Sequence, residues 1–134
     1  MFFSRLLNGT LKQNIKTMRN VVSVKITTHP TNKTIDGYCP ICVLLIFKRK
    51  YAPVTLKIPP VQNKSDLIKN DHTGEAVICH SAKYYKDRTT INEYLNDVLR
   101  VARAAIKELI DKDISYLNVL DLANEVKQTI DKDL

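Results

Sequence analysis

The sequence predicts an α+β fold, with a small sheet-containing N-terminal lobe followed by a three-helix C-terminal lobe. Three observations favour this class. Residues 21–58 contain β-branched and alternating apolar segments, which are typical of strands. The pair Pro59-Pro60 lacks two backbone donors and ends this pattern. Beyond it, apolar residues recur at the three- and four-residue spacing of amphipathic helices.

The first predicted part is a basic amphipathic segment over residues 1–20, before the lobes at 21–60 and 61–134. Residues 1–19 contain no acid, and Leu7, Leu11, Ile15 and Met18 recur at helical spacing. This pattern fits an organelle-targeting presequence and a packed first helix equally well, and both interpretations stay open. Because so short a helix is marginal alone in water, we expect it to be ordered only in a larger assembly.

The N-terminal lobe is predicted to contain three strands. Residues 21–28 alternate and are β-branched, and residues 29–37 are rich in turn-forming types. An apolar run at 41–47 and an alternating run at 51–58 flank the basic residues 48–50, which predicts a hairpin.

The C-terminal lobe is predicted to begin with a short helix at 66–69 and a loop to about residue 89. Thr90 and Glu93 have the spacing of a capping box, so a long helix should start there and continue to Leu109. A last helix is expected from about Leu117 to Ile130.

The net charge of +7 is unevenly distributed. Residues 1–64 contain eleven Lys and Arg but one acid, Asp36, whereas residues 65–134 contain ten bases and thirteen acids. A basic half suits phosphate contacts, although a soluble basic surface would have the same composition. No apolar run approaches the roughly 20 residues that cross a bilayer, so we expect no membrane partner.

Candidate catalytic and metal-binding residues are few. Cys39 and Cys42 have zinc-knuckle spacing, and Cys79 with His80 would be the other ligands. Because neighbouring strand residues point to opposite faces, we expect small apolar cysteines and no metal. No nucleophile, base and oxyanion donors occur together, so the sequence predicts a protein that is not an enzyme and has no cofactor.

Bases and aromatic rings alternate in the segment directly before the long helix. Cationic groups reach phosphates and tyrosines stack on unpaired bases, so this segment is a candidate RNA-binding loop. A solvated loop whose tyrosines cover the core is the alternative. Three bases on one face of the long helix are a less specific candidate, since charged helix faces are usually solvated. The two groups are Lys83, Tyr84, Tyr85, Lys86 and Arg88, and Arg100, Arg103 and Lys107.

The stretch from Gly37 to Pro60 resembles the ribosomal protein L-eleven family. There a Gly followed shortly by Pro-Ile opens a strand, as Gly37 and Pro40-Ile41 do here, and Val-Thr-x-Lys-x-Pro-Pro ends the next strand, as residues 54–60 do here. Leu67-Ile68-Lys69 resembles the apolar-Lys run of the first C-terminal helix in that family, which adds Lys69 to the RNA-binding candidates. The N-terminal segment and the final helix depart from the family pattern.

This resemblance implies a structural constituent of the large ribosomal subunit at the stalk base. Its partners would be ribosomal RNA, neighbouring stalk ribosomal proteins and translation GTPases. The divergence and the acid-free N-terminus favour a mitochondrial ribosome, with another organellar or a bacterial ribosome as the alternative. A second hypothesis is a DNA-binding module resembling the arm-binding domain of phage-type integrases, which also has a basic three-stranded sheet followed by a helix. A third, a zinc-binding adaptor, depends on Cys39, Cys42, Cys79 and His80.

Overall fold

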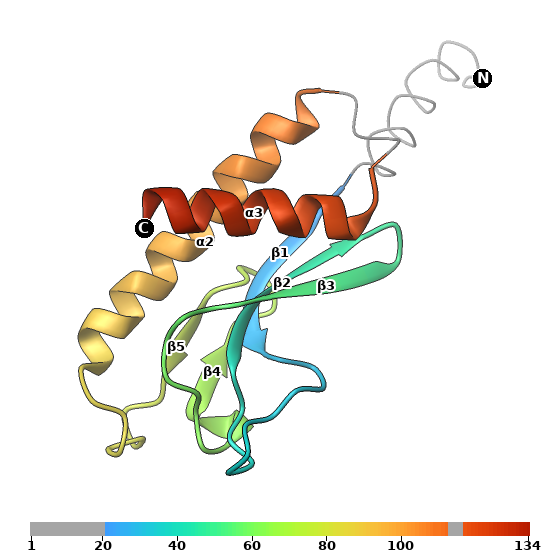
Figure 1. Ribbon diagram of the computed structural model, residues 1–134. Coiled ribbons are helices and arrows are strands. Elements are labelled where there is room, and N and C mark those ends of the chain that lie inside the picture. Colours follow the sequence, from blue (N-terminus) through green and yellow to red (C-terminus); the bar gives the residue numbers. More distant parts are fainter. Residues whose placement is uncertain (1–20, 113–116) are drawn as a thin grey trace, which may run out of the picture.

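The computed structural model describes residues 21–112 and 117–134 (Figure 1). Our predictions for residues 1–20 therefore lie outside the described residues. The described part has an α+β fold with two small antiparallel sheets and two helices. In chain order the elements are β1 (Ser23–Thr28), β2 (Ile41–Phe47), β3 (Lys50–Thr55), the 3₁₀ turn η1 (Lys64–Asp66), β4 (Leu67–Lys69), β5 (Ala76–Ile78), α2 (Arg88–Ile110) and α3 (Val119–Asp133).

The first three strands form one antiparallel sheet in the order β1-β2-β3, as the sequence predicted for this region. Its hairpin between β2 and β3 has a loop of only two residues, because Phe47 pairs directly with Lys50. Both loop residues have positive φ, 52° at Lys48 and 66° at Arg49. This is the type I′ geometry that matches the right-handed twist of the two strands.

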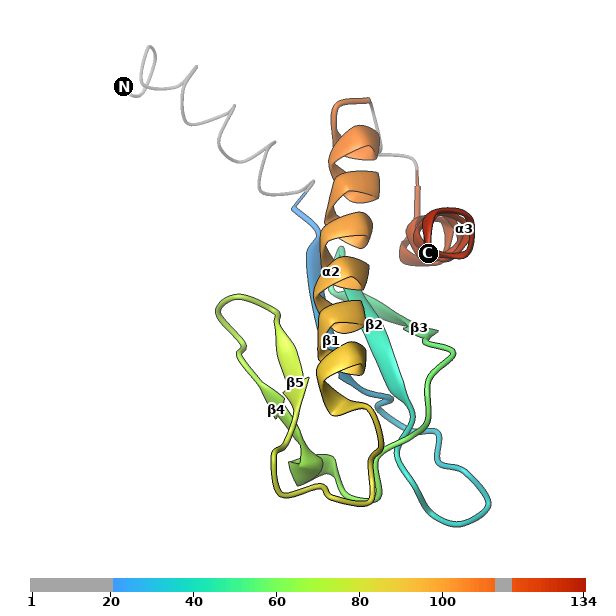
Figure 2. The same cartoon turned by 90° about the vertical axis from the view of Figure 1, so that its left-hand side faces the viewer.

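Alternation along the strands gives this sheet one apolar face. Val24, Ile26, Val43, Leu45 and Val54 point to the same side and are buried. The helices pack there, with α3 against β2 and β3 and α2 against β1. Figure 2 shows α3 on one side of the sheet, the β4–β5 hairpin on the other, and α2 running beside β1.

The short helix predicted at residues 66–69 is wrong. Only the 3₁₀ turn η1 precedes β4, and β4 pairs antiparallel with β5, so that Leu67 lies opposite Ile78 and Lys69 opposite Ala76. Leu67 and Ile78 are buried while Ile68 is exposed, which is strand alternation. The three-helix C-terminal lobe is therefore not confirmed, since α2 and α3 are the helices in the described part of this region.

The two helices differ in how their N-termini are capped. α2 begins at Arg88, two residues before Thr90, after Asp87 in the left-handed region with φ 55°. Thr90 therefore lies within the helix, and the predicted capping box does not form the cap. The cap of α3 is a capping box instead, in which Asn118 Oδ1 accepts from the Asp121 amide at 3.0 Å.

One hydrophobic core contains residues from both sides of Pro59-Pro60. Leu45 from β2, Val61 from the connection, Val98 from α2 and Val126 from α3 are each fully buried in the same cluster. The sequence boundary at the Pro pair is therefore not a boundary between separate cores.

Candidate nucleic-acid interface

The loop before α2, our first candidate interface, has one tyrosine that is unable to stack on a base. Tyr85 is only 5% exposed, and its hydroxyl donates to the Pro59 carbonyl. Burial raises the pKa of Tyr85 to about 12. Its ring belongs to the core and holds the loop against the segment that follows β3.

Tyr84 is more accessible but is also held in place. Its ring is 39% exposed, and its hydroxyl donates to Asp66 Oδ2 at 2.6 Å and accepts from the Gln62 amide at 2.8 Å. Partial burial, together with the hydrogen bond to the Asp66 carboxylate, raises the pKa of Tyr84. The exposed part of this ring remains available for a contact.

The bases of this loop also divide into two kinds. Arg88 is half-buried and donates from Nη1 to the Ala82 carbonyl at 3.0 Å, so part of its hydrogen-bonding capacity supports the loop. Lys83 and Lys86 are exposed. Within this loop, these two lysines and the exposed part of Tyr84 are left for a ligand.

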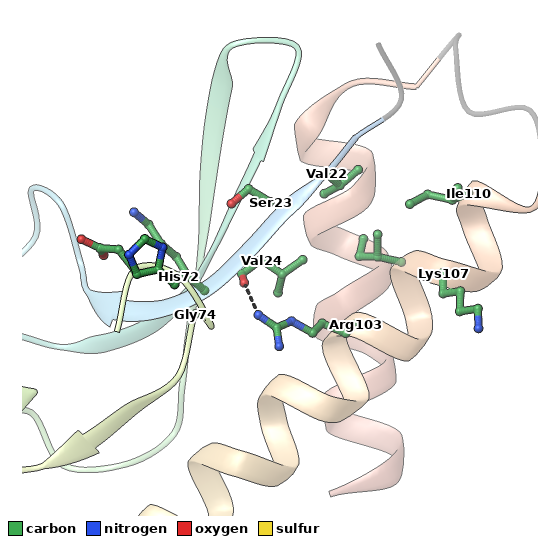
Figure 3. A pocket seen from close by; sticks show the side chains of 11 residues that line it. Val22, Ser23, Val24, His72, Gly74, Arg103, Lys107 and Ile110 are labelled. Carbon is green, nitrogen blue, oxygen red and sulfur yellow. Dashed lines mark hydrogen bonds between the residues drawn. The ribbon is translucent and has the colours of Figure 1, made fainter. Parts of the chain in front are cut away.

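The three bases predicted on α2 do not act as one surface. Arg100 is exposed and pairs with Asp97, three residues before it, at 3.3 Å. Arg103 reaches across to β1, where its Nη2 donates to the Val24 carbonyl at 3.3 Å and also to the Thr73 carbonyl. Lys107 is exposed, and in Figure 3 its side chain points away from Arg103.

Lys69, the remaining predicted residue, lies at the end of β4. Its ammonium is 3.5 Å from Thr27 Oγ1 on β1. This interaction brings β4 against the side of the sheet opposite the helices, where Thr27 and Cys42 are buried. Lys69 therefore closes one end of this face of the sheet.

A pocket of about 360 Å³ lies between β1, the β4–β5 turn and α2 (Figure 3). Apolar side chains of Val22, Ile106 and Ile110 line one part of it, and Lys25, Asp71, His72 and Arg103 line another. Arg103 crosses the pocket to bond the Val24 carbonyl, so its main visible role is to fasten α2 to the edge of β1.

The excess of positive charge in the described chain lies on the three-stranded sheet and its connecting loops, where the sequence predicted no individual binding residue. Residues 21–58 contain six Lys and Arg but one acid, Asp36. The other described residues, 59–112 and 117–134, contain eleven bases and twelve acids. The imbalance of charge in the sequence indicated this region. Which strand face is uncovered became clear only from the packing of the helices.

On the side of the sheet away from the helices, which β4 and β5 cover in part, two neighbouring rows contain the six accessible positions that we call the open face: Ser23, Lys25, Leu44, Ile46, Tyr51 and Pro53. They form two cross-strand rows, Ser23–Ile46–Tyr51 and Lys25–Leu44–Pro53. Lys25 is the cation of this face, and it forms no hydrogen bond or ion pair with the described residues. Tyr51 is 55% exposed.

The β2–β3 turn extends the same basic surface at one end of the sheet. Arg49 is exposed there, whereas the exposed Lys50 is the first residue of β3 and lies on the side of the sheet that the helices cover. Lys48 is anchored, because its Nζ donates to the Leu117 carbonyl at 3.2 Å and lies 5.0 Å from the centre of the Phe47 ring. Arg49, at the tip, is therefore the cation best placed to reach outward.

The described residues contain no group of three or more His, Cys, Asp or Glu side chains that could hold a metal ion. Cys39 and Cys42 are both buried, and burial raises the pKa of the Cys42 thiol to about 12. Within the described ranges, no helix is both long and apolar enough to cross a membrane.

Scans against protein-family models, curated proteins and solved structures found no match for this chain. We therefore infer the function from the residues and their geometry.

Proposed function

We propose that this protein is a DNA-binding module that acts by binding and catalyses no reaction. The open face enters the major groove of a DNA duplex, and the β2–β3 turn contacts backbone phosphates. The observation that carries this proposal is the three-stranded sheet itself. Helices cover one of its faces, the other carries Lys25, and the strands with their connecting loops, residues 21–58, contain six Lys and Arg but one acid.

The dimensions of the sheet suit a major groove. Strands lie about 4.8 Å apart, so the axes of β1 and β3 are separated by roughly 10 Å. The major groove of B-form DNA is about 12 Å wide and admits an α-helix or a two-stranded β-ribbon, so two neighbouring strands of the open face fit within it. The corresponding groove of an RNA duplex is deep and narrow, and side chains cannot read it.

The accessible aromatic rings also favour duplex DNA over unpaired RNA. Proteins that bind unpaired bases stack them on exposed aromatic side chains. The loop predicted to do this has a buried Tyr85 and a partly covered Tyr84, and the open face has one tyrosine, Tyr51. A basic three-stranded sheet is what we expected of an arm-binding module of phage-type integrases, although here the β4–β5 hairpin precedes the helix α2.

A ribosomal role is our second proposal. It is supported by the residues shared with the L-eleven family at 37–60 and by the exposure of Lys83 and Lys86 beside the start of α2, where free amides attract anions. In that case the ligand would be folded ribosomal RNA at the stalk base, and the location a mitochondrial ribosome.

The test compares a random-sequence DNA duplex of about 20 base pairs with a folded stalk-base fragment of ribosomal RNA. Fluorescence anisotropy at several salt concentrations gives the affinity and its salt slope for each. We expect the duplex to bind more tightly, and Arg49→Gly to reduce the slope by about one unit because one phosphate contact is lost. Lys127→Ala, on the exposed side of α3, is the matched control and should change nothing.

Tighter binding of the RNA fragment would overturn the DNA proposal in favour of the ribosomal one. If neither nucleic acid binds with a salt-dependent affinity, both proposals are wrong.

A further inference from the structure

We infer that the open face recognises a short DNA sequence through one hydrogen-bonding side chain and two apolar side chains. Lys25 recognises a guanine, and Leu44 and Ile46 contact the methyl groups of neighbouring thymines. This inference rests on the proposed function, because it assumes that the open face lies in a major groove.

The open face is small enough to contact only a few base pairs. On each strand, the residues of the two rows are two positions apart in sequence. The rows are therefore separated by about 6.6 Å along the strand direction. Base pairs in a duplex are stacked about 3.4 Å apart. The two rows therefore cover two to three base pairs, and each side chain meets one or two of them.

Lys25 has the chemistry to read guanine. In the major groove, guanine presents the acceptors N7 and O6 together, and a lysine or arginine that donates to both is the commonest specific contact. Lys25 is half-buried beside Asp71 and His72 of the β4–β5 turn, and its ammonium forms no hydrogen bond or ion pair with the described residues. Along β1 it lies between Thr27, which is buried, and the accessible Ser23.

The backbone that carries Lys25 is fixed on both sides. The Ile26 amide donates to the Gly74 carbonyl at 2.9 Å, and the Val24 carbonyl accepts from Arg103 at 3.3 Å (Figure 3). A Cβ on Gly74 would lie 3.3 Å from the Lys25 Cα, so the β4–β5 turn presses directly on this residue. A side chain that discriminates bases needs this kind of rigid support, because small displacements lose the contact.

Leu44 and Ile46 cannot donate or accept a hydrogen bond, yet they lie at the centre of the face on β2. An apolar side chain in a major groove recognises the thymine methyl group, the one apolar feature that a base pair presents there. Cross-strand neighbours have Cβ atoms about 5 Å apart, so Leu44 lies beside Lys25. The site should therefore combine a guanine with adjacent thymines.

Arg49 lies in the turn at the end of the sheet, beyond the two rows. It is placed to contact a phosphate, which sets affinity and salt dependence without reading sequence. The structure thus separates a specificity residue, Lys25, from a residue that contributes to affinity, Arg49.

The experiment selects bound duplexes from a pool with a randomised segment of about 12 base pairs, using the full chain. The wild type should enrich a guanine flanked by thymines. Lys25→Met keeps an apolar stem but removes the ammonium, and it should reduce the guanine preference about 10- to 100-fold. Lys25→Arg should retain that preference. Arg49→Gly, the matched control, should weaken binding to all sequences while the enriched sequence stays the same.

Replacing the selected thymines by deoxyuridine removes only the methyl groups. This change should weaken binding by the wild type several-fold but have little effect on Leu44→Ala/Ile46→Ala. Thermal unfolding of each variant shows that the fold is retained.

Duplex binding without an enriched guanine, or the same enrichment by Lys25→Met, would overturn the inference and leave the DNA-binding function standing. Equal binding of thymine and deoxyuridine duplexes by the wild type would overturn the assignment of Leu44 and Ile46. If no duplex binds at all, the proposed function fails together with the inference.

Discussion

Lys48 and Arg49 occupy the two turn positions where positive φ normally favours Asn and Gly. A side chain with a Cβ is disfavoured there by about 1 kcal/mol or more. Backbone strain of this kind accumulates at functional sites, where the surrounding structure enforces it. In this turn the strained positions are cations at the end of the open face, which agrees with a phosphate contact.

Arg49→Gly should therefore stabilise the protein while weakening its binding to DNA. Glycine removes the Cβ conflict at φ 66°, and the gain is partly offset by the greater freedom of glycine in the unfolded chain. We expect the free energy of unfolding in urea to rise by roughly 0.5 kcal/mol. Lys50→Gly is the control, because it places glycine inside β3 and should lower stability. A loss of stability in Arg49→Gly would show that the turn is not strained.

The burial of two adjacent tyrosines in the loop before α2 could not be predicted from the sequence. Tyr84 and Tyr85 are chemically the same, and the sequence left stacking on RNA and covering the core as alternatives for both. The structure buries Tyr85 and leaves Tyr84 partly exposed, with their rings 6.2 Å apart in an edge arrangement. Burial depends on the segment around Pro59, which is distant in sequence, so local composition could not distinguish the two rings.

At the scale of elements, the β4–β5 turn fastens the free edge of β1. Gly74 has φ 78°, and its carbonyl accepts from the Ile26 amide. A Cβ there would lie 2.6 Å from Arg103 Nη2 and 2.7 Å from the Val24 carbonyl oxygen. Glycine is required at this position for its backbone conformation and also for the close approach of the two elements.

Gly74→Ala should lower the free energy of unfolding by about 2 kcal/mol or more, because strain in φ adds to the displacement of Val24 and Arg103. Gly37→Ala is the matched control. Gly37 has a similar φ of 81°, but a Cβ there meets nothing within 4 Å, so it should cost about 1 kcal/mol. Equal losses in urea denaturation for the two variants would show that the turn does not press on β1.

The sequence predicted the elements that have long, regular patterns. The three strands of the first sheet and the helix after Leu117 were found where alternation and helical spacing were continuous. The short β4 and β5 were missed, because three residues are too few to show a period. Thr90 and Glu93 have the capping spacing, but the helix starts earlier, at Arg88, where the loop held by Tyr85 meets it.

At the scale of the whole molecule, one sheet separates the helix-covered core from the accessible open face. The helices carry nearly balanced charge, and residues 21–58, the strands and their connecting loops, carry the excess of bases. The sequence predicted phosphate contacts for its basic half, but its candidate binding residues lie mainly on α2 and the preceding loop. Tertiary contacts of Arg88, Arg103 and Tyr85 explain this difference, because each of these side chains bonds the protein itself.

The buried thiol and phenol make the stability of the molecule dependent on alkaline pH. Burial raises the pKa of Cys42 from 9.0 to about 12 and that of Tyr85 from 10.0 to about 12. Between pH 9 and 12 the unfolded chain therefore binds fewer protons than the folded protein. In this range the free energy of unfolding falls as pH rises, whereas below pH 9 the full stability is present.

We expect the free energy of unfolding to begin to fall near pH 9, where the unfolded chain loses the Cys42 proton. The fall should steepen above pH 10, where Tyr85 and the partly buried Tyr84 and Tyr94 contribute. Each group contributes at most about 1.4 kcal/mol per pH unit. Urea denaturation at pH 8, 9 and 10 under reducing conditions measures the slope. Cys42→Ala should be less stable throughout, because it leaves a small cavity, but should lose most of the decline between pH 9 and 10.

Cys79→Ala is the control for this experiment, because the Cys79 thiol is accessible and its hydrogen bond with Ser81 lowers its pKa. Removing it should leave the decline in place. If Cys42→Ala declines as steeply as the wild type, the Cys42 thiol ionises in the folded protein as easily as in the unfolded chain. The side of the sheet beneath Lys69 would then admit water, and the open face would extend along the whole sheet.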